Sequence, residues 1–322
     1  MELAEVETTP PGRDEVRLTV SACGICGTDR AFASGGFSNM SWPLTLGHEI
    51  AGTIAELGVG VEGFAVGDRV AVGWFGGNCN RCEQCRKGAF IHCLNGKVPS
   101  YQYPGGYAQS VTVPSNALAR IPSELSDVEA APLGCAGVTT YNALRHTKAL
   151  PGDRVAVIGI GGLGHLGVQF ARAMGFETIA IARGAAKEDD ARKLGAHHYI
   201  DSTAGDVAKA LQALGGATVV LGTAASSAAM AQTVGGLLPR GELITIGVTA
   251  DPLPISPVQL ISSGKSIVGH PSGTAKDVED TMHFAVLSGV RAWIEELPLA
   301  QAADGYAAME QGRARYRTVL TM

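Results

Sequence analysis

The chain has 322 residues, of which 46% are hydrophobic and 17% charged, and its formal net charge is −5. This length predicts about two domains with a large core, and the composition is typical of a soluble globular protein. The slightly acidic balance and the lack of a basic block argue against nucleic acid as a partner. No apolar run approaches the length of a membrane span, so we expect no membrane partner either.

The N-terminus and the cysteines indicate a reducing compartment. Met1 is followed by Glu2 and Glu5, not by a basic and then hydrophobic leader, so we expect no secretion signal. We therefore expect a cytoplasmic protein. Its seven cysteines are predicted to be metal ligands or free thiols, not disulfides.

The first part of the chain predicts β structure. Val16, Leu18 and Val20 alternate with polar residues, which is typical of a strand with one buried face. Two further strands are expected here, over residues 68–72 and 107–113.

From about residue 127 helices are expected, and residues 136–145 give the clearest one. The later part of the chain then alternates short apolar strands with alanine-rich helical segments. The strands are predicted at 155–158, 178–182, 218–222 and 243–248. This alternation is typical of a doubly wound parallel sheet. A helix over 299–309 and a strand over 317–322 indicate a return to the first, β-rich domain.

A glycine turn follows the strand at 155–158 and precedes a helical segment. It reads G-x-G-x-x-G, a pattern that becomes specific between a strand and a helix. The first glycine permits the tight turn, the second lets the backbone approach a pyrophosphate, and the third allows close packing. The amides at the start of the helix form an anion site. We therefore predict a dinucleotide site at Gly159, Gly161, Gly162, Leu163 and Gly164.

Four cysteines lie close together as C-x2-C-x2-C-x7-C, at Cys79, Cys82, Cys85 and Cys93. Four thiolates can close a tetrahedral zinc shell with no open position, which is a structural site. An iron–sulfur cluster is the rival use of four clustered cysteines, and four unliganded thiols are the third alternative. The loop is polar and has no core of its own, so we expect a metal to organise it.

Three further residues have the chemistry of a second metal site. Cys26, His48 and a second cysteine would give zinc three protein ligands and an open fourth position, which is the catalytic form. Spacing alone does not bring these segments together, and His48 by itself would more simply be a structural histidine. Cys23 and Cys26 look like a C-x2-C pair, yet pairing them would leave Cys135 without a partner.

Five motifs in order carry a resemblance: CGICGTD, LGHEIAG, the four-cysteine loop, LGCAGVTTYNAL and VAVIGIGGLGHLGVQFARAMG. The chain resembles the zinc-dependent alcohol dehydrogenases of the medium-chain dehydrogenase/reductase superfamily, nearest to the bacterial and cinnamyl-alcohol-dehydrogenase-like branches. The resemblance implies a GroES-like catalytic domain over 1–135, completed by 271–322. It also implies an inserted Rossmann domain over 136–270, with the active site in the cleft between the domains. Relatives form homodimers or homotetramers.

The resemblance also implies roles for individual residues. Cys26, His48 and Cys135 would bind the catalytic zinc, and Glu49 matches a glutamate that can approach or transiently ligate the metal. Asp29 matches the carboxylate that orients the zinc-bound histidine. With the four clustered cysteines, this implies two zinc ions per chain.

Other matches concern substrate and cofactor. Thr28 matches the hydroxyl that passes the substrate proton, and Trp42 and Phe75 fall where the family lines its substrate pocket. Thr139 matches a residue packed on the nicotinamide, and Arg317 matches one that contacts the cofactor phosphates. The implied reaction is hydride transfer between the nicotinamide and an alcohol or aldehyde, with zinc acting on the substrate oxygen.

The second strand of the Rossmann domain bears on cofactor choice. NAD enzymes place an acid at the end of this strand to hold the ribose hydroxyls. Here the strand ends at Ala182 and is followed by Arg183, which could take a 2′-phosphate. We therefore predict NADP(H) in preference to NAD(H).

Some features depart from the family pattern. The family usually has a strand before the one near Glu15; either it is missing through truncation, or Glu2 to Val6 replaces it. Gly27 and Ala31 stand where some relatives carry a basic residue and a histidine. Two other functions remain open: a polyol or amino-alcohol dehydrogenase, and a non-catalytic zinc- or cofactor-binding protein. Many polyol relatives have a glutamate where Cys135 stands, and non-catalytic relatives lack the ligand set.

Overall fold

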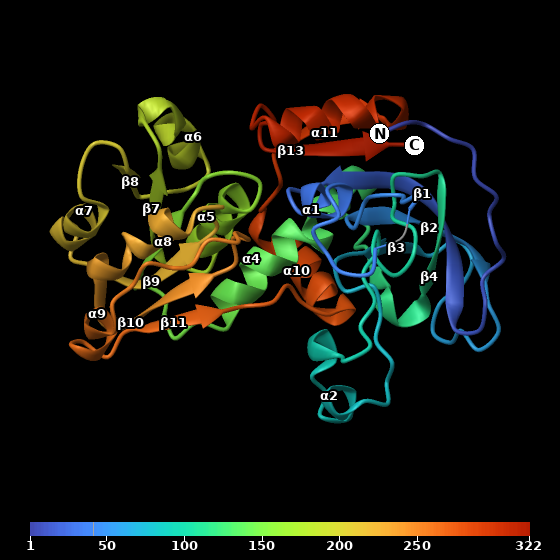
Figure 1. Cartoon of the computed structure of the whole chain (residues 1–322), viewed down its shortest axis with the longest axis horizontal. Helices are drawn as coiled ribbons and strands as arrows, with labels where there is room; N and C mark the ends of the chain where they lie inside the picture. The colour runs from blue at the N-terminus through green and yellow to red at the C-terminus, as the bar shows by residue number, and fades with distance from the viewer. Residues whose placement is uncertain (41) are drawn as a thin grey trace. The chain divides into compact units, whose positions relative to one another are not determined.

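The computed structural model describes residues 1–40 and 42–322 (Figure 1). The chain divides into two compact units. The first unit comprises Met1–Val138 and Ser272–Met322, and the second comprises Thr139–Pro271. In the part of the chain that the structure describes, no helix is both long enough and apolar enough to span a membrane.

The first unit is built on a seven-stranded sheet. The strand order is β12-β13-β1-β2-β3-β5, and β4 pairs with β1 outside this path. All pairs are antiparallel except β12 with β13. The strands are β1 (Glu15–Ile25), β2 (Ile50–Leu57), β3 (Arg69–Val72), β4 (Ser110–Pro114), β5 (Ala119–Arg120), β12 (Ile294–Pro298) and β13 (Arg317–Thr321).

The strand β1 is the centre of this sheet because it pairs with β2, β4 and β13. Val16, Leu18 and Val20 are buried, as their alternation predicts, and they pack with side chains of β2, β3 and β4 in one core. The strand predicted over 107–113 is wrong at its start. β4 begins at Ser110, and the backbone amide of Tyr107 instead donates to Leu46 O at 2.8 Å.

The helices of the first unit are short except at its C-terminal end. They are α1 (Asp29–Ala33), α2 (Glu83–Arg86), α3 (Asp127–Ala130), α10 (Ala275–Ser288) and α11 (Ala302–Glu310), with 3₁₀ turns η1 (Phe90–His92), η2 (Ser115–Ala117), η3 (Ala131–Gly134) and η6 (Leu299–Gln301). The helix α4 (Ala136–Arg145) has the bounds predicted for it, and the division after Val138 falls within it.

The N-terminal segment is not part of the sheet. Residues 1–12 contain neither helix nor strand, so the idea that Glu2 to Val6 replaces a missing strand is wrong. All five of these residues are exposed. They bury no face, and a strand without a buried face has little to fix it against a neighbour.

The second unit contains a six-stranded parallel sheet in the order β11-β10-β9-β6-β7-β8. Numbered from β6, this order is 3-2-1-4-5-6 read from the β8 edge, which is that of a doubly wound dinucleotide-binding sheet. The strands are β6 (Arg154–Ile158), β7 (Glu177–Ala182), β8 (His198–Asp201), β9 (Ala217–Gly222), β10 (Leu237–Thr245) and β11 (Ser266–Gly269).

The helices between these strands are also short. They are α5 (Gly164–Ala173), α6 (Glu188–Lys193), α7 (Val207–Ala213), α8 (Ser227–Ala231) and α9 (Pro257–Ile261), with 3₁₀ turns η4 (Ala185–Lys187) and η5 (Val234–Gly236). The inner strands are almost wholly buried, as parallel strands covered on both faces should be. The strand predicted over 243–248 ends too late, because β10 stops at Thr245 and the chain then turns, with Ile246 and Gly247 both donating to Gly222 O.

Candidate active site

Four side chains from distant parts of the sequence meet in the first unit. The ligand atoms of Cys26, His48, Glu49 and Cys135 all lie within 4.8 Å of one another. Cys26 follows the end of β1, and His48 and Glu49 directly precede β2. Antiparallel pairing of Cys23 with Ile50 places these two segments side by side, and η3 delivers Cys135 to the same point.

Asp29 holds two of these residues. Its Oδ1 lies 3.0 Å from His48 Nδ1, and its Oδ2 accepts from the Cys26 amide at 2.9 Å. Both Asp29 and His48 are fully buried. With Nδ1 directed at the carboxylate, Nε2 is the ring nitrogen left for a metal, and this atom has no hydrogen-bond partner in the described part of the chain. A buried nitrogen of this kind, beside two thiols, suits a zinc ligand.

Electrostatics at the site favour a thiolate. The pKa of Cys26 is well below its ordinary value, chiefly because the Cys135 thiol bonds to it, and in spite of burial. Burial alone would lower the pKa of His48, but the charges of Asp29 and Cys26 outweigh it and raise that pKa. Zinc binds the thiolate form of cysteine, so the lowered pKa prepares Cys26 for a metal.

Glu49 lies at the same point but is already paired. Arg317, on β13, donates to both carboxylate oxygens of Glu49, and both side chains are buried. Gly24 makes room for this carboxylate, since a Cβ at Gly24 would overlap Glu49 Oε2. Thr28 is also close, with its hydroxyl 3.7 Å from Cys26 Sγ. The five side chains predicted as catalytic therefore lie close together. They are Cys26, Thr28, His48, Glu49 and Cys135.

Aromatic rings border His48 on another side. Trp74 meets the His48 ring edge-on with a centroid distance of 5.6 Å, and Phe32 lies at 5.9 Å. Phe37 stacks on Phe32, and Tyr101 lies against Phe37. We call Phe32, Phe37, Trp74 and Tyr101 the aromatic wall. Sequence reasoning missed all four, because aromatic residues scattered over 70 positions give no periodic signal.

The two predicted pocket residues have different surroundings. Trp42 is 58% exposed and Phe75 only 7% exposed. Neither has a ring contact with His48 among those found in the described residues, so their place in the substrate pocket stays a prediction.

The four-cysteine loop has the geometry of a single-ion site. All four sulfurs lie within 4.8 Å of one another, with separations of 3.5 Å for Cys82 to Cys85 and Cys79 to Cys93, and 3.8 Å for Cys82 to Cys93. A zinc tetrahedron with bonds of about 2.3 Å has ligand edges of about 3.8 Å. In an iron–sulfur cluster the irons and sulfides hold the cysteines farther apart. These separations therefore favour one zinc ion over a cluster.

Amide groups around this loop stabilise thiolates. The amides of Arg81 and Cys82 and the side chain of Asn95 bring the pKa of Cys79 down to about 5. The Cys79 amide in turn donates to Cys93 Sγ at 3.3 Å. Such donors favour the charged form of a sulfur, although burial outweighs them at Cys93 and raises its pKa to about 11. The loop is therefore folded around its own sulfurs, not around an apolar core.

The glycine turn in the second unit behaves as its pattern predicts. Gly159 has φ +94°, and a Cβ there would meet the backbone of Ala224 at 2.8 Å. A Cβ on Gly164 would overlap the Gly159 carbonyl, whereas one on Gly161 would meet nothing within 4 Å. The first and third glycines are thus required by the turn and its packing. The second, with open space beside it, suits the approach of a phosphate group.

β7 itself ends without an acid and is followed by a positive charge. Arg183 is exposed directly after Ala182. Lys187, which sequence reasoning missed, donates from Nζ to Ile160 O in the glycine turn at 2.6 Å. The carboxylate at the end of the next strand, Asp201, accepts from the Gly184 amide at 2.7 Å.

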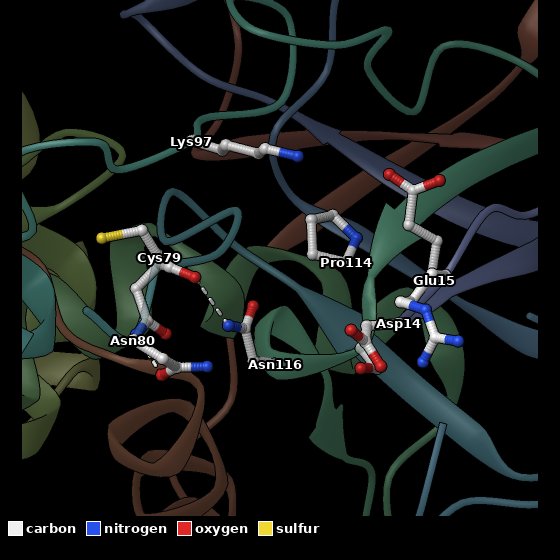
Figure 2. Close-up of a pocket in the computed structure, with 10 residues that line it drawn as sticks. Asp14, Glu15, Cys79, Asn80, Lys97, Pro114 and Asn116 are labelled. Atoms are coloured by element: carbon white, nitrogen blue, oxygen red, sulfur yellow. Dashed lines mark hydrogen bonds between the residues drawn. The ribbon is translucent and has the colours of Figure 1, made fainter. Parts of the chain in front are cut away.

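A separate cavity of about 450 Å³ lies beside the four-cysteine loop (Figure 2). Polar and charged side chains surround it, including Asp14, Glu15, Lys97 and Asn116, and it reaches Cys79. None of the four clustered residues Cys26, His48, Glu49 and Cys135 is among its lining residues. It is therefore a different place from the candidate active site.

Two known domain families match this chain. The alcohol dehydrogenase GroES-like domain matches residues 12–123, and the zinc-binding dehydrogenase domain matches residues 162–286. Alcohol dehydrogenase patD of Penicillium expansum is 41% identical over 320 residues, covering 99% of this chain and 94% of the relative.

Two solved structures extend the comparison. The cinnamyl alcohol dehydrogenase SbCAD4 from Sorghum bicolor has a TM-score of 0.90 at 29% identity, over 98% of this chain and 92% of that one. The enzyme CAD from Helicobacter pylori, complexed with NADP(H), has a TM-score of 0.85 at 27% identity, over 97% of this chain and 91% of that one.

The GroES-like and Rossmann-like folds together define a medium-chain dehydrogenase/reductase. The chain belongs to the zinc-dependent alcohol dehydrogenase family of that superfamily. The family and the fold class predicted from the sequence are confirmed.

Proposed function

We propose that the protein transfers a hydride between NADP(H) and an alcohol/aldehyde pair, with a zinc ion at Cys26, His48 and Cys135. The observation that carries this proposal is the convergence on one point of two thiols and a buried His48 Nε2 that has no hydrogen-bond partner among the described residues. Asp29 fixes the ring so that this nitrogen faces the thiols. Cys26, His48 and Cys135 would together hold the ion.

Each group at the site has its own proposed role. A zinc ion bound there supplies Lewis acidity toward the substrate oxygen. The Thr28 hydroxyl, next to Cys26, passes the substrate proton. The aromatic wall would border the substrate and keep water from His48. Glu49 lies beside the proposed metal position, and its carboxylate is bound by Arg317.

A second zinc ion is proposed for the four-cysteine loop. Support comes from the sulfur separations and from the amides that favour thiolates. Four thiolates leave no open position, so this ion would hold the loop and take no part in the reaction.

The choice of NADP(H) is argued from charge. Arg183 is exposed at the end of β7, and Lys187 lies against the glycine turn. A 2′-phosphate needs cations at this place, whereas NAD enzymes need an acid there to hold the ribose hydroxyls. Thr139 is proposed to pack on the nicotinamide. Arg317 is proposed to contact the cofactor phosphates, for which its guanidinium, buried against Glu49 in this structure, would have to leave that ion pair.

The test is oxidation of NADPH by the purified, zinc-replete protein across a panel of aliphatic and aromatic aldehydes. We expect a clear aldehyde-dependent rate, with aromatic aldehydes favoured because rings stack on the aromatic wall. NADH at equal concentration should give a lower rate. No rate with any aldehyde from zinc-replete protein would contradict the proposal and favour a polyol or amino-alcohol substrate.

A further inference from the structure

A tyrosine outside the ligand set contacts the carboxylate that holds His48. The Tyr107 hydroxyl donates to Asp29 Oδ2 at 2.7 Å. The same oxygen accepts from the Cys26 amide, and the other oxygen bonds to His48 Nδ1. One buried carboxylate thus connects two proposed zinc ligands, and Tyr107 supplies its remaining side-chain contact among the hydrogen bonds found in the described residues.

The Tyr107 ring is itself fixed against the segment that carries His48. Its backbone amide donates to Leu46 O at 2.8 Å, and the Gly106 amide donates to Gly47 O at 2.8 Å. Gly47 has φ +104°, and a Cβ there would lie 2.5 Å from Tyr107 Cδ1. The ring therefore packs directly on Gly47, the residue before His48. Tyr107 is therefore connected to His48 in two ways. Its ring packs on Gly47, the neighbour of His48, and its hydroxyl bonds to Asp29, which bonds to the His48 ring.

We propose that Tyr107 is a positioning residue for the metal site. Its hydroxyl holds the Asp29 carboxylate in the one orientation in which Oδ1 meets His48 and Oδ2 meets Cys26. It does not touch the metal position, and its effect passes through Asp29. This inference rests on the proposed zinc at Cys26, His48 and Cys135, and it adds a residue beyond the ligands and Asp29.

The physical reason is that a buried carboxylate with a missing donor can rotate. Loss of the hydroxyl leaves Asp29 Oδ2 with only the Cys26 amide as a donor. The energy difference between the observed carboxylate rotamer and the other rotamers therefore decreases. Groups that orient metal ligands typically change metal affinity or activity 10- to 100-fold when they are removed. Because Tyr107 is one hydrogen bond farther from the proposed metal position than Asp29, we expect an effect at the lower end of this range.

Tyr103 provides a matched control. It lies four residues before Tyr107, and its hydroxyl donates to Gly76 O at 3.0 Å. It makes no contact with Asp29 among the hydrogen bonds of the described residues. Tyr103→Phe and Tyr107→Phe therefore each remove one hydroxyl from the same segment, but only the second removes a bond to the carboxylate.

The experiment replaces the metal at the open site with Co²⁺ and follows its d–d absorption and its rate of release to EDTA. Wild type, Tyr107→Phe, Tyr103→Phe, Asp29→Asn and the Tyr107→Phe/Asp29→Asn double variant are compared. Zinc retained at the four-cysteine loop checks that each variant is folded. We expect Tyr107→Phe to shift the d–d band and to release the metal about tenfold faster, and Tyr103→Phe to behave as wild type. The double variant should match Asp29→Asn alone, because Tyr107 acts through Asp29.

Wild-type spectrum and release rate in Tyr107→Phe would overturn the inference while leaving the proposed function intact. An equal change in Tyr103→Phe, or additive effects in the double variant, would overturn it as well, since either would indicate a general packing role. A wild-type protein that binds neither Zn²⁺ nor Co²⁺ at Cys26, His48 and Cys135 would overturn the proposed function together with this inference.

Discussion

Arg317 and Glu49 form an ion pair inside the first unit, with the Arg317 side chain 3% exposed and that of Glu49 fully buried. The pair connects β13, near the C-terminus, to the segment just before β2. It therefore joins the two parts of the chain that flank the second unit in sequence. Nothing in the local sequence predicts it, because the partners are far apart along the chain.

This pair predicts the result of removing one partner. Arg317→Leu leaves the Glu49 carboxylate buried beside Cys26 without its cation, which costs about 3–5 kcal/mol. We expect unfolding in urea at a lower midpoint, with a smaller loss in the Arg317→Leu/Glu49→Gln double variant because no charge is then left unpaired. Equal stability of wild type and Arg317→Leu would show that the pair contributes nothing.

The four-cysteine loop predicts a change in metal content. Cys82→Ser removes one of four ligands, so bound zinc should fall from two ions per chain to one, and the thermal midpoint should fall because the loop has no apolar core. Cys23→Ser is the control. Cys23 is fully buried but belongs to neither cluster of ligands, so this variant should keep both ions. Metal analysis that finds two zinc ions in Cys82→Ser would refute the assignment.

The charge at the end of β7 predicts a loss of cofactor preference. Arg183→Ala removes an exposed cation, and the KM for NADPH should rise about tenfold while the KM for NADH stays within about twofold. Arg192→Ala is the control, since Arg192 is already bonded to Glu188 and to His197 O. Steady-state kinetics with both cofactors measure this. The same preference in wild type and Arg183→Ala would mean that Arg183 does not contact the 2′-phosphate.

The position of Thr28 beside Cys26 predicts a catalytic effect without a structural one. Thr28→Ala should lower kcat about a hundredfold or more, because a positioned proton carrier contributes on that scale. Zinc content and the thermal midpoint should remain those of wild type. Thr28→Ser keeps a hydroxyl and should retain most of the activity. Unimpaired turnover in Thr28→Ala would remove this residue from the mechanism.

Local chemistry explains why part of the site was predictable. Gly159 and Gly164 have the tight turn and the close packing that their pattern predicts, because both features are set within one turn of the chain, and Gly161 has open space beside it. The four-cysteine loop is also local, and its short spacing by itself brings the sulfurs near one another. The family resemblance implies Cys26, His48 and Cys135 together. Pairing of β1 with β2 brings the first two side by side, and η3 brings Cys135 to the same point.

Contacts made across the sheet explain what the sequence did not reveal. The sequence predicts Tyr107 at the start of a strand, yet its backbone amide bonds to Leu46 O and its hydroxyl bonds to Asp29. Trp74 meets the His48 ring, a contact that the sequence does not predict. Such contacts depend on register and on loop paths that residue spacing does not determine. Lys187 was missed for the same reason, since its partner Ile160 lies on a different turn.

The most direct measurement follows the hydride itself. The zinc-replete protein is given an aromatic aldehyde and NADPH that carries deuterium on the transferred position of C4, and the product alcohol is examined by mass spectrometry. We predict one deuterium on the carbinol carbon from the wild type, and none from Cys135→Ser, which lacks a ligand of the open site. A wild-type protein that holds two zinc ions but forms no deuterated alcohol from any aldehyde tested would contradict the account.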